Sequence, residues 1–123
     1  MIECITGKVD FCWNQGSTIS HRIIWSSGAT AASALPVDLT NYSARLQLRS
    51  EVSSPDIVAE LTTANGLIVL GGTAGTIDLN YSAVSSAAIT AAQYVYDLEL
   101  VSGVPVVTRL LEGIIKVFGE VTR

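Results

Sequence analysis

The strongest constraint on the fold of this chain is a strict alternation of apolar and polar residues near its C-terminus. Over residues 94–100 the apolar side chains share one face of an extended strand, and Asp97 and Glu99 share the other. Such a period of two indicates a half-buried antiparallel strand. A turn at Ser102–Pro105 and a second apolar run, Val106–Phe118, follow directly. Together these segments predict a β-hairpin that closes a compact sheet.

The rest of the chain shows the same alternation in short segments. Further strands are predicted at residues 9–14, 18–25, 42–50, 57–61, 67–70 and 76–81. Between two of them, Asn65 and Gly66 supply positions that tolerate positive φ, which predicts a tight hairpin turn. Residues 82–92 are rich in Ser and Ala, and we expect one short helical turn there that crosses between two sheets. Seven or eight short strands with so little helix predict an all-β chain, a single antiparallel β-sandwich over residues 1–123.

The amino-acid composition favours a subunit of an assembly. The chain is 49% hydrophobic and only 15% charged, whereas typical soluble domains are about 25% charged. So small a sandwich cannot bury all of its apolar side chains, and large exposed apolar patches mark interfaces. A net charge of −4 argues against a general nucleic-acid-binding protein. The sequence shows no secretory signal and no run long enough for a transmembrane helix, so we expect no membrane insertion.

The two cysteines do not predict a metal or redox site. Cys4 and Cys12 are separated by seven residues, a spacing that fits neither a zinc site nor a thioredoxin motif. We expect them to be small apolar residues of a protein made in a reducing cytosol, and we expect no metal and no cofactor. The Gly-, Ala- and Ser-rich stretch Ser26–Pro36 is predicted to be an exposed loop.

Several polar groups could carry chemistry, but each has a simpler explanation. Asp97 and Glu99 form a carboxylate pair, yet catalytic carboxylates need environments that separate their pKa values, and alternation predicts only a solvated face. His21 is the sole histidine, so a catalytic triad would require it, and its inward position predicts a packed or interface residue instead. Gly71–Gly75 lacks the Gly-Lys-Ser/Thr ending of a phosphate-binding loop and leads into a strand. The sequence therefore predicts no enzyme.

A short basic stripe lies on the predicted strand at residues 42–50. Arg45, Gln47 and Arg49 share its polar face. Pairing with acidic residues of a neighbouring strand is the first expectation for this stripe. A protein interface is the second, because arginine is enriched at protein contacts.

The chain resembles small tail and baseplate proteins of tailed phages and prophages, which have an immunoglobulin-like sandwich fold. The segments that carry the resemblance are Gln15–Gly16, the strand ending at Trp25, Val37–Thr40, Tyr42–Arg49, Glu60–Thr63, Asn65–Gly66, Gly75–Leu79, Tyr94–Leu100 and the terminal hairpin. They cover nearly the whole chain, and the terminal motif is the most specific of them. The sequence departs from the family at Ile89–Ala92, where Leu-Pro-x-Gly is common, and in its Ala-rich loop Ser26–Pro36.

The resemblance implies a non-enzymatic virion protein, made in the host cytoplasm, that forms part of a tail, baseplate or fibre attachment. It is expected to form a homo-oligomer and to bind other virion proteins, and Arg45, Arg49, Trp13 and Trp25 are the predicted interface residues. One alternative is a capsid decoration protein, which shares the fold and differs in its place in the particle. Another is a module that binds a host glycan or receptor, which an exposed Trp13 or Trp25 would favour. An outer-membrane barrel is disfavoured by the short strands and sparse aromatic residues.

Overall fold

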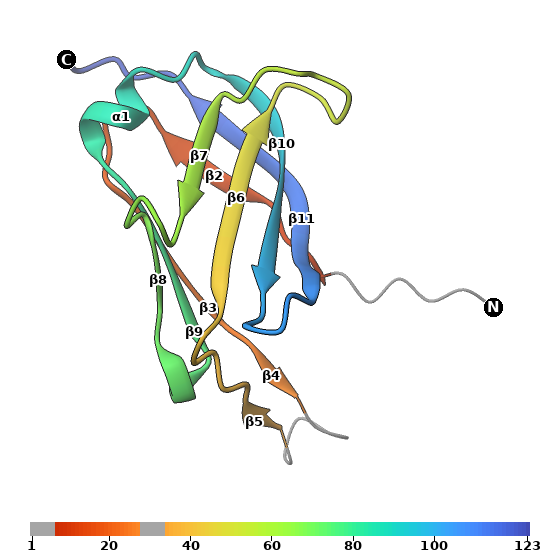
Figure 1. Cartoon of the computed structure of the whole chain (residues 1–123). Helices are drawn as coiled ribbons and strands as arrows, with labels where there is room; N and C mark the ends of the chain where they lie inside the picture. The colour runs from red at the N-terminus through yellow and green to blue at the C-terminus, as the bar shows by residue number, and fades with distance from the viewer. Residues whose placement is uncertain (1–6, 28–33) are drawn as a thin grey trace.

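The computed structural model describes residues 7–27 and 34–123, and these residues form two packed β-sheets, a separate two-stranded ribbon and one short helix. The strands are β1 Gly7–Lys8, β2 Phe11–Asn14, β3 Ile19–Ile24, β4 Ser26–Ser27, β5 Leu35–Pro36, β6 Ser43–Arg49, β7 Ala59–Thr62, β8 Ile68–Leu70, β9 Thr76–Tyr81, β10 Ala92–Val101 and β11 Val107–Phe118. A 3₁₀ turn, η1 (Gly72–Ala74), precedes β9, and the helix α1 (Ala83–Ala87) precedes β10. Figure 1 shows α1 and the C-terminus at one end of the sandwich, and β4 and β5 at the other.

The strand order identifies the architecture. One sheet has the order β1–β11–β10–β6–β7, with β2 also paired to β11, and the other has the order β3–β9–β8. Strands β3, β9 and β8 thus take the places of strands B, E and D of an immunoglobulin sandwich, and β6, β10 and β11 take those of C, F and G. The fold is an immunoglobulin-like β-sandwich, antiparallel except where β1 and β2 run parallel to β11.

The core lies between the inward faces of the two sheets, as the alternation predicted. In β6, for example, Ala44, Leu46 and Leu48 are buried. The buried apolar side chains are Trp13, Ile19, Leu39, Ala44, Leu46, Leu48, Ala59, Leu61, Ile68, Ile77, Leu79, Ile89, Tyr94, Tyr96, Leu98, Leu100, Leu111, Ile115 and Val117. They come from both sheets, so burial of apolar surface is the main force that joins them.

The crossover from β9 to β10 confirms the predicted helical turn. The hydroxyl of Ser82 caps α1 by accepting the backbone N–H of Ser85, at 3.1 Å. At the start of β10 the buried Tyr94 donates its hydroxyl to the backbone carbonyl of Thr90, at 2.5 Å. A tyrosine near the start of strand F that bonds to the backbone just upstream is the tyrosine corner of immunoglobulin-like domains. The predicted terminal hairpin, β10–β11, is confirmed as well.

The prediction of a hairpin at Asn65–Gly66 is wrong. The turn itself exists: Gly66 has φ 80°, and the Asn65 side chain accepts the backbone N–H groups of Thr62 and Leu67 at 2.9 and 3.0 Å. However, β7 pairs with β6 in one sheet, and β8 pairs with β9 in the other. The turn therefore carries the chain across the sandwich and does not fold it back on itself.

Two predicted inward positions are exposed, because their strands begin later than expected. Val9 is 39% exposed and lies in the break between β1 and β2, while Ile57 is 46% exposed and precedes β7. The predicted loop Ser26–Pro36 is paired at its two ends, where β4 and β5 form a short ribbon. Residues 28–33 of that loop lie outside the described residues.

Candidate interaction surfaces

The outer face of the six-stranded sheet carries the predicted basic stripe. Arg45 lies opposite Glu99 of β10 in the strand register, and its Nε is 2.7 Å from that carboxylate. Gln47 donates to Glu60 of β7 at 2.6 Å. Arg49 donates to the side-chain oxygen of Gln47 and to the carbonyl of Ser54, at 2.8 and 2.9 Å. Cross-strand pairing therefore accounts for Arg45 and Gln47, as the sequence predicted first, whereas Arg49 bonds within its own strand and to the loop that follows it.

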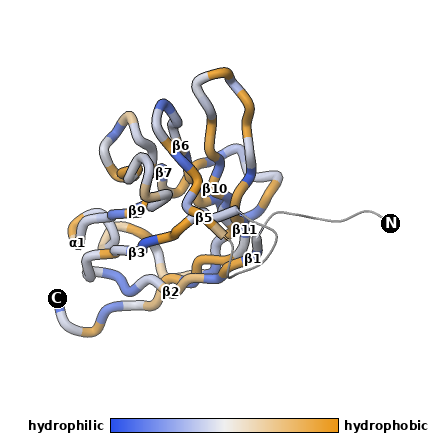
Figure 2. Tube along the Cα trace, turned by 90° about the horizontal axis from the view of Figure 1, so that it is seen from below, coloured by the Kyte–Doolittle hydropathy of each residue, from blue (hydrophilic) through white to orange (hydrophobic). Residues whose placement is uncertain are grey.

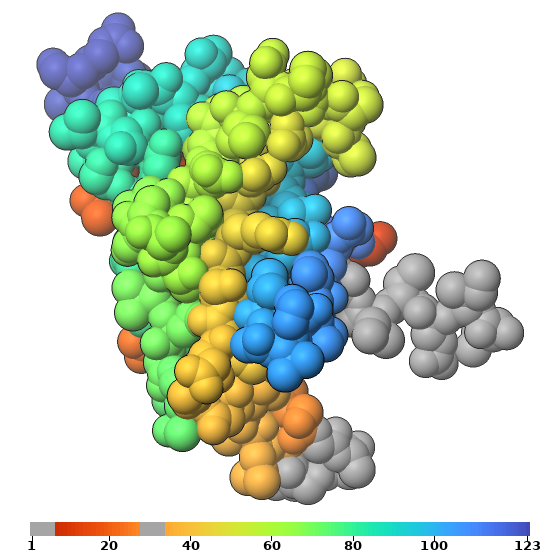
Figure 3. Space-filling view, viewed as in Figure 1, coloured from red at the N-terminus to blue at the C-terminus, as the bar shows by residue number. Residues whose placement is uncertain are grey.

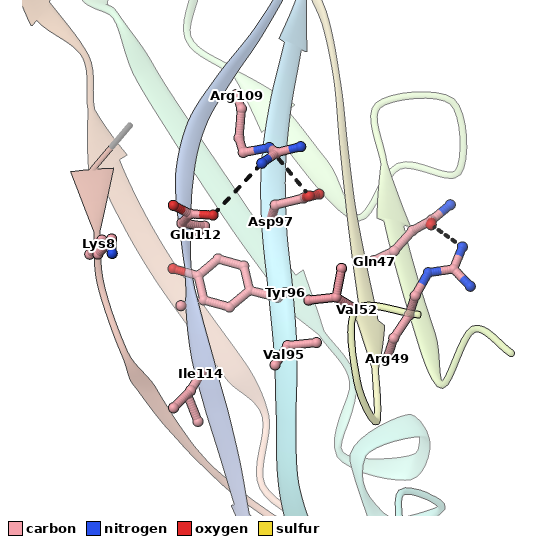
Figure 4. A pocket seen from close by; sticks show the side chains of 11 residues that line it. Lys8, Gln47, Arg49, Val52, Val95, Tyr96, Asp97, Arg109, Glu112 and Ile114 are labelled. Carbon is pink, nitrogen blue, oxygen red and sulfur yellow. Dashed lines mark hydrogen bonds and ion pairs between the residues drawn. The ribbon is translucent and has the colours of Figure 1, made fainter. Parts of the chain in front are cut away.

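A shallow pocket of about 400 Å³ opens on the same face (Figure 4). Its apolar surface comes from Val52, Val95 and Ile114, and Val52 reaches over it from the loop between β6 and β7. Its charged residues are Lys8, Arg49, Asp97, Arg109 and Glu112. The lining contains no His, Cys or Ser, and so it offers no nucleophile of the usual triad type.

Asp97 is the most perturbed carboxylate of this pocket. Partial burial raises its pKa, the charges of Glu99 and Glu112 raise it further, and the charges of Arg109 and Arg45 oppose the rise. Arg109 Nε lies 3.5 Å from Asp97, and its Nη1 lies 3.8 Å from Glu112. Since all three side chains are between a third and a half exposed, these ion pairs contribute little to stability. The arrangement is a partly hydrated network of three charged side chains.

Trp13 is buried, which corrects its predicted place at an interface. Its side chain is 1% exposed, and its Nε1–H donates to Nε2 of His21 at 3.1 Å. His21 also stacks on Phe11, with ring centroids 4.3 Å apart, and burial lowers the pKa of His21. His21 is thus packed between Phe11 and Trp13, which is one of the two places predicted for it. Trp13 belongs to the core and offers no ring face to a partner.

Trp25 supports the loops at the end of the sandwich that holds β4 and β5. Its partly buried ring packs edge-on against Tyr42, with centroids 6.2 Å apart. Its backbone N–H donates to the carbonyl of Gly75 at 2.9 Å, and its carbonyl accepts the N–H of Val37 at 2.8 Å. Leu39 N–H likewise bonds to Gly72 at 2.9 Å. These bonds hold two connections together, β3–β6 and β8–β9.

This loop end, defined as residues 34–37, 71–75 and 101–107, contains no charged residue, and the exposed Asp38 lies directly beside it. No Asp, Glu, Lys, Arg or His occurs in residues 23–37, 61–77 or 100–108 of the sequence. Figure 3 shows the β10–β11 turn beside the chain that enters β6, and Figure 2 views the molecule from this end. Leu35, Val104 and Val106 are 71, 79 and 61% exposed there. The predicted interface residues did not include this surface, although its three charge-free runs are visible in the sequence.

The remaining chemistry-bearing groups do not assemble into a site. Cys12 is an exposed free thiol, whereas Cys4 lies outside the described residues. Within residues 7–27 and 34–123, no three His, Cys, Asp or Glu side chains gather as metal ligands would. The loop Gly71–Gly75 forms η1 and a turn before β9, with Gly72 and Gly75 at positive φ. No helix of the described part of the chain has the length and apolarity to cross a membrane.

Comparison with known proteins adds little beyond the fold. No family model matches the chain, and no curated protein matches it. A solved structure of extracellular domains 3–5 of Drosophila OTK is similar over 92% of this chain and 34% of the OTK chain, at 17% sequence identity and a TM-score of 0.38. The immunoglobulin-like assignment rests on the strand order of the two sheets.

Proposed function

We propose that this chain is a non-enzymatic structural subunit of a tailed-phage virion, part of a tail, baseplate or fibre attachment, and that it acts by binding other virion proteins. The place in a virion comes from the sequence resemblance. The observation that carries the binding role is the charge-free loop end with its exposed Leu35, Val104 and Val106. The proposed role needs no cofactor, no nucleic acid and no membrane insertion.

The chemistry of the loop end suits a permanent protein contact. Burying exposed apolar surface is favourable by about 25 cal/mol per Å². Burying a charge without a partner costs several kcal/mol, and the three loops that form this end contain only one charged residue, the exposed Asp38 beside Val37. A partner with an apolar surface that leaves Asp38 in water therefore gains the burial term there. Cores of protein interfaces are depleted of charge in the same way.

The glycan-binding alternative has less support. Sugars stack on exposed aromatic faces, but Trp13 is buried and Trp25 packs against Tyr42. A capsid decoration protein would use the same loop end, so only the place of the chain within the particle separates that alternative from the proposal.

The test uses particles of the virus that encodes the chain. Immunogold labelling is expected on the tail or baseplate, and absence of the chain from purified particles would refute the proposed function. Labelling on the head instead would select the decoration protein. The Val104→Lys variant places a charge on the loop end, and we expect its incorporation to fall about tenfold, equivalent to about 1.4 kcal/mol.

The matched control is Val84→Lys. Val84 is 84% exposed on α1, at the opposite end of the sandwich from β4 and β5 (Figure 1). The control carries the same change of charge and volume, so normal incorporation of Val84→Lys together with loss of Val104→Lys assigns the contact to the loop end. Equal incorporation of the two variants would contradict that assignment.

A further inference from the structure

The three-stranded sheet ends at β3, and hydrogen-bond directions show which peptide groups of β3 face away from the sheet. The N–H of Asn80 donates to Leu67, and the carbonyl of Thr76 accepts from Gly71, both at 2.8 Å. The even-numbered residues of β9 therefore face β8, because peptide groups alternate in direction along a strand. The odd-numbered residues of β9 face β3, where the register pairs Ile77 with Ile23, Leu79 with His21 and Tyr81 with Ile19.

The N–H and C=O groups of Ser20, Arg22 and Ile24 consequently point to the open side of β3. The bond from Trp25 N–H to the Gly75 carbonyl agrees with this assignment. Both residues are odd-numbered, like the residues of β3 and β9 whose peptide groups face each other. No strand pairs with the open side of β3 among the described residues. Six backbone hydrogen-bonding groups are thus presented in a row.

This edge has few of the features that usually prevent strand pairing. Edge strands are normally protected by prolines, bulges, free charges or shortness. β3 is six residues long, contains no proline and keeps an unbroken register with β9. Its one charged residue, Arg22, is bound to Asp78 by two hydrogen bonds of 2.7 and 3.0 Å. On the same outer face, Ile24 is 60% exposed.

The other sheet edges of the described chain are shorter or interrupted. β8 has three residues, and β7 has four and carries Glu60. The β1–β2 edge is broken at Val9 and Asp10, and the Asp10 carboxylate accepts a hydrogen bond from the N–H of Ile114 at 3.0 Å. β3 is therefore the longest continuous open edge.

We infer that β3 pairs antiparallel with β3 of a second copy of the chain, which joins two three-stranded sheets into one continuous sheet. The inference rests on the proposed role in assembly and names one partner and its geometry. A second copy suits this edge because Arg22 and Asp78 neutralise each other, so that two identical edges meet without net charge. A two-fold contact also needs only one self-complementary surface.

Charge excludes one register of the pairing. A two-fold axis at Arg22 would place two guanidinium groups opposite each other, and like charges directly opposite are destabilising. A two-fold axis at His21 instead places Ser20 opposite Arg22 of the second copy. Residues 18–24 of the two copies then pair along their whole length. In this register the outward peptide groups of Ser20 and Arg22 all find partners.

The experiment combines sedimentation velocity with residue-resolved amide exchange on the full chain. Concentrations from about 10 µM to about 1 mM are used, because dimerisation follows mass action. We expect a concentration-dependent dimer, in which the amides of Ser20, Arg22 and Ile24 become protected as the dimer forms. The amide of Leu70, on the open side of β8, is expected to exchange at the same rate at every concentration.

Three variants test the contact. Ser20→Pro removes an outward N–H without removing a bond within the sheet, and it should raise the dimer dissociation constant about tenfold, since one hydrogen bond is lost in each copy. Ile24→Lys should also raise it about tenfold, because it places two added charges at the contact. The matched control is Val69→Lys, since Val69 is 51% exposed on the same outer face but lies on β8. Thermal unfolding confirms that each variant is folded.

Three results would overturn the inference, and none of them overturns the proposed function. A chain that stays monomeric with rapidly exchanging edge amides has no such contact. Association that survives the Ile24→Lys change but is lost in Val104→Lys occurs at the loop end, which supports the proposed function alone. Protection of the edge amides at every dilution, lost when residues 1–6 are deleted, would mean that the chain covers its own edge.

Discussion

Removal of one hydroxyl tests whether the tyrosine corner stabilises the crossover between the two sheets. Tyr94 is 7% exposed and donates to the carbonyl of Thr90 at 2.5 Å, which ties the end of the α1 crossover to the start of β10. The change Tyr94→Phe keeps the ring and its packing and deletes only the donor. Any loss of stability therefore reports on this hydrogen bond.

The expected loss is about 1 kcal/mol. A buried hydrogen bond contributes about 0.5–1.5 kcal/mol net, and a carbonyl left without a partner in a dry site costs about 1–3 kcal/mol. Thr90 is exposed, so water can reach its carbonyl in the variant, and the smaller range applies. For a chain of this size, about 1 kcal/mol corresponds to a fall in Tm of about 4 °C.

Urea unfolding followed by tryptophan fluorescence measures this loss, because Trp13 becomes exposed on unfolding. With a slope of about 2 kcal/mol per M, the midpoint should fall by about 0.5 M while the slope stays the same. The control is Tyr81→Phe, since the hydroxyl of Tyr81 has no hydrogen-bond partner among the described residues, and its loss should stay below about 0.5 kcal/mol. Equal losses for the two variants would refute the role of the corner.

Three further predictions follow from the core. Burial lowers the pKa of His21, so as the pH falls His21 takes up its proton at a higher pH in the unfolded chain than in the folded chain. The free energy of unfolding should therefore fall as pH decreases below the unfolded pKa of about 6.5. Urea midpoints at several pH values, compared with His21→Phe, check this. Leu46→Ala removes a side chain that is 0% exposed and should cost about 2–5 kcal/mol in the same assay. Gly113→Ala would place a Cβ 2.2 Å from the carbonyl oxygen of Val9, so a fall in Tm of several degrees is expected by calorimetry.

The sequence predicted the sheet faces well because alternation is a local property. In β6 and β10, each buried residue is followed by one that faces outward, and Leu46 and Leu98 meet across the two strands in the core. The terminal hairpin was predictable for the same reason, since its two strands are joined by a short turn. Trp13 also lies on the face that alternation assigned to it, and only its use as an interface residue was wrong.

The partner of each strand was less predictable than its faces. Asn65 and Gly66 form a turn whose side-chain hydrogen bonds are all local. These bonds are the same whether the next strand returns beside β7 or crosses to the other sheet. The choice depends on contacts distant in sequence, such as the pairing of β8 with β9 and the burial of Ile68. Likewise, a single run without charge does not reveal that three such runs meet at one end.

The positions of the charges explain why both proposed contacts avoid the outer face of the six-stranded sheet. That face carries Arg45, Glu99, Arg109 and Asp97, all partly exposed to water. A partner that covered it would desolvate at least four charges, and their mutual attraction repays such a cost only with very good geometry. The loop end has only the exposed Asp38 beside it, and the edge of β3 brings only the Arg22 ion pair. In the proposed assembly, each subunit is therefore held by one end and one strand edge, while the charged face and its pocket stay hydrated.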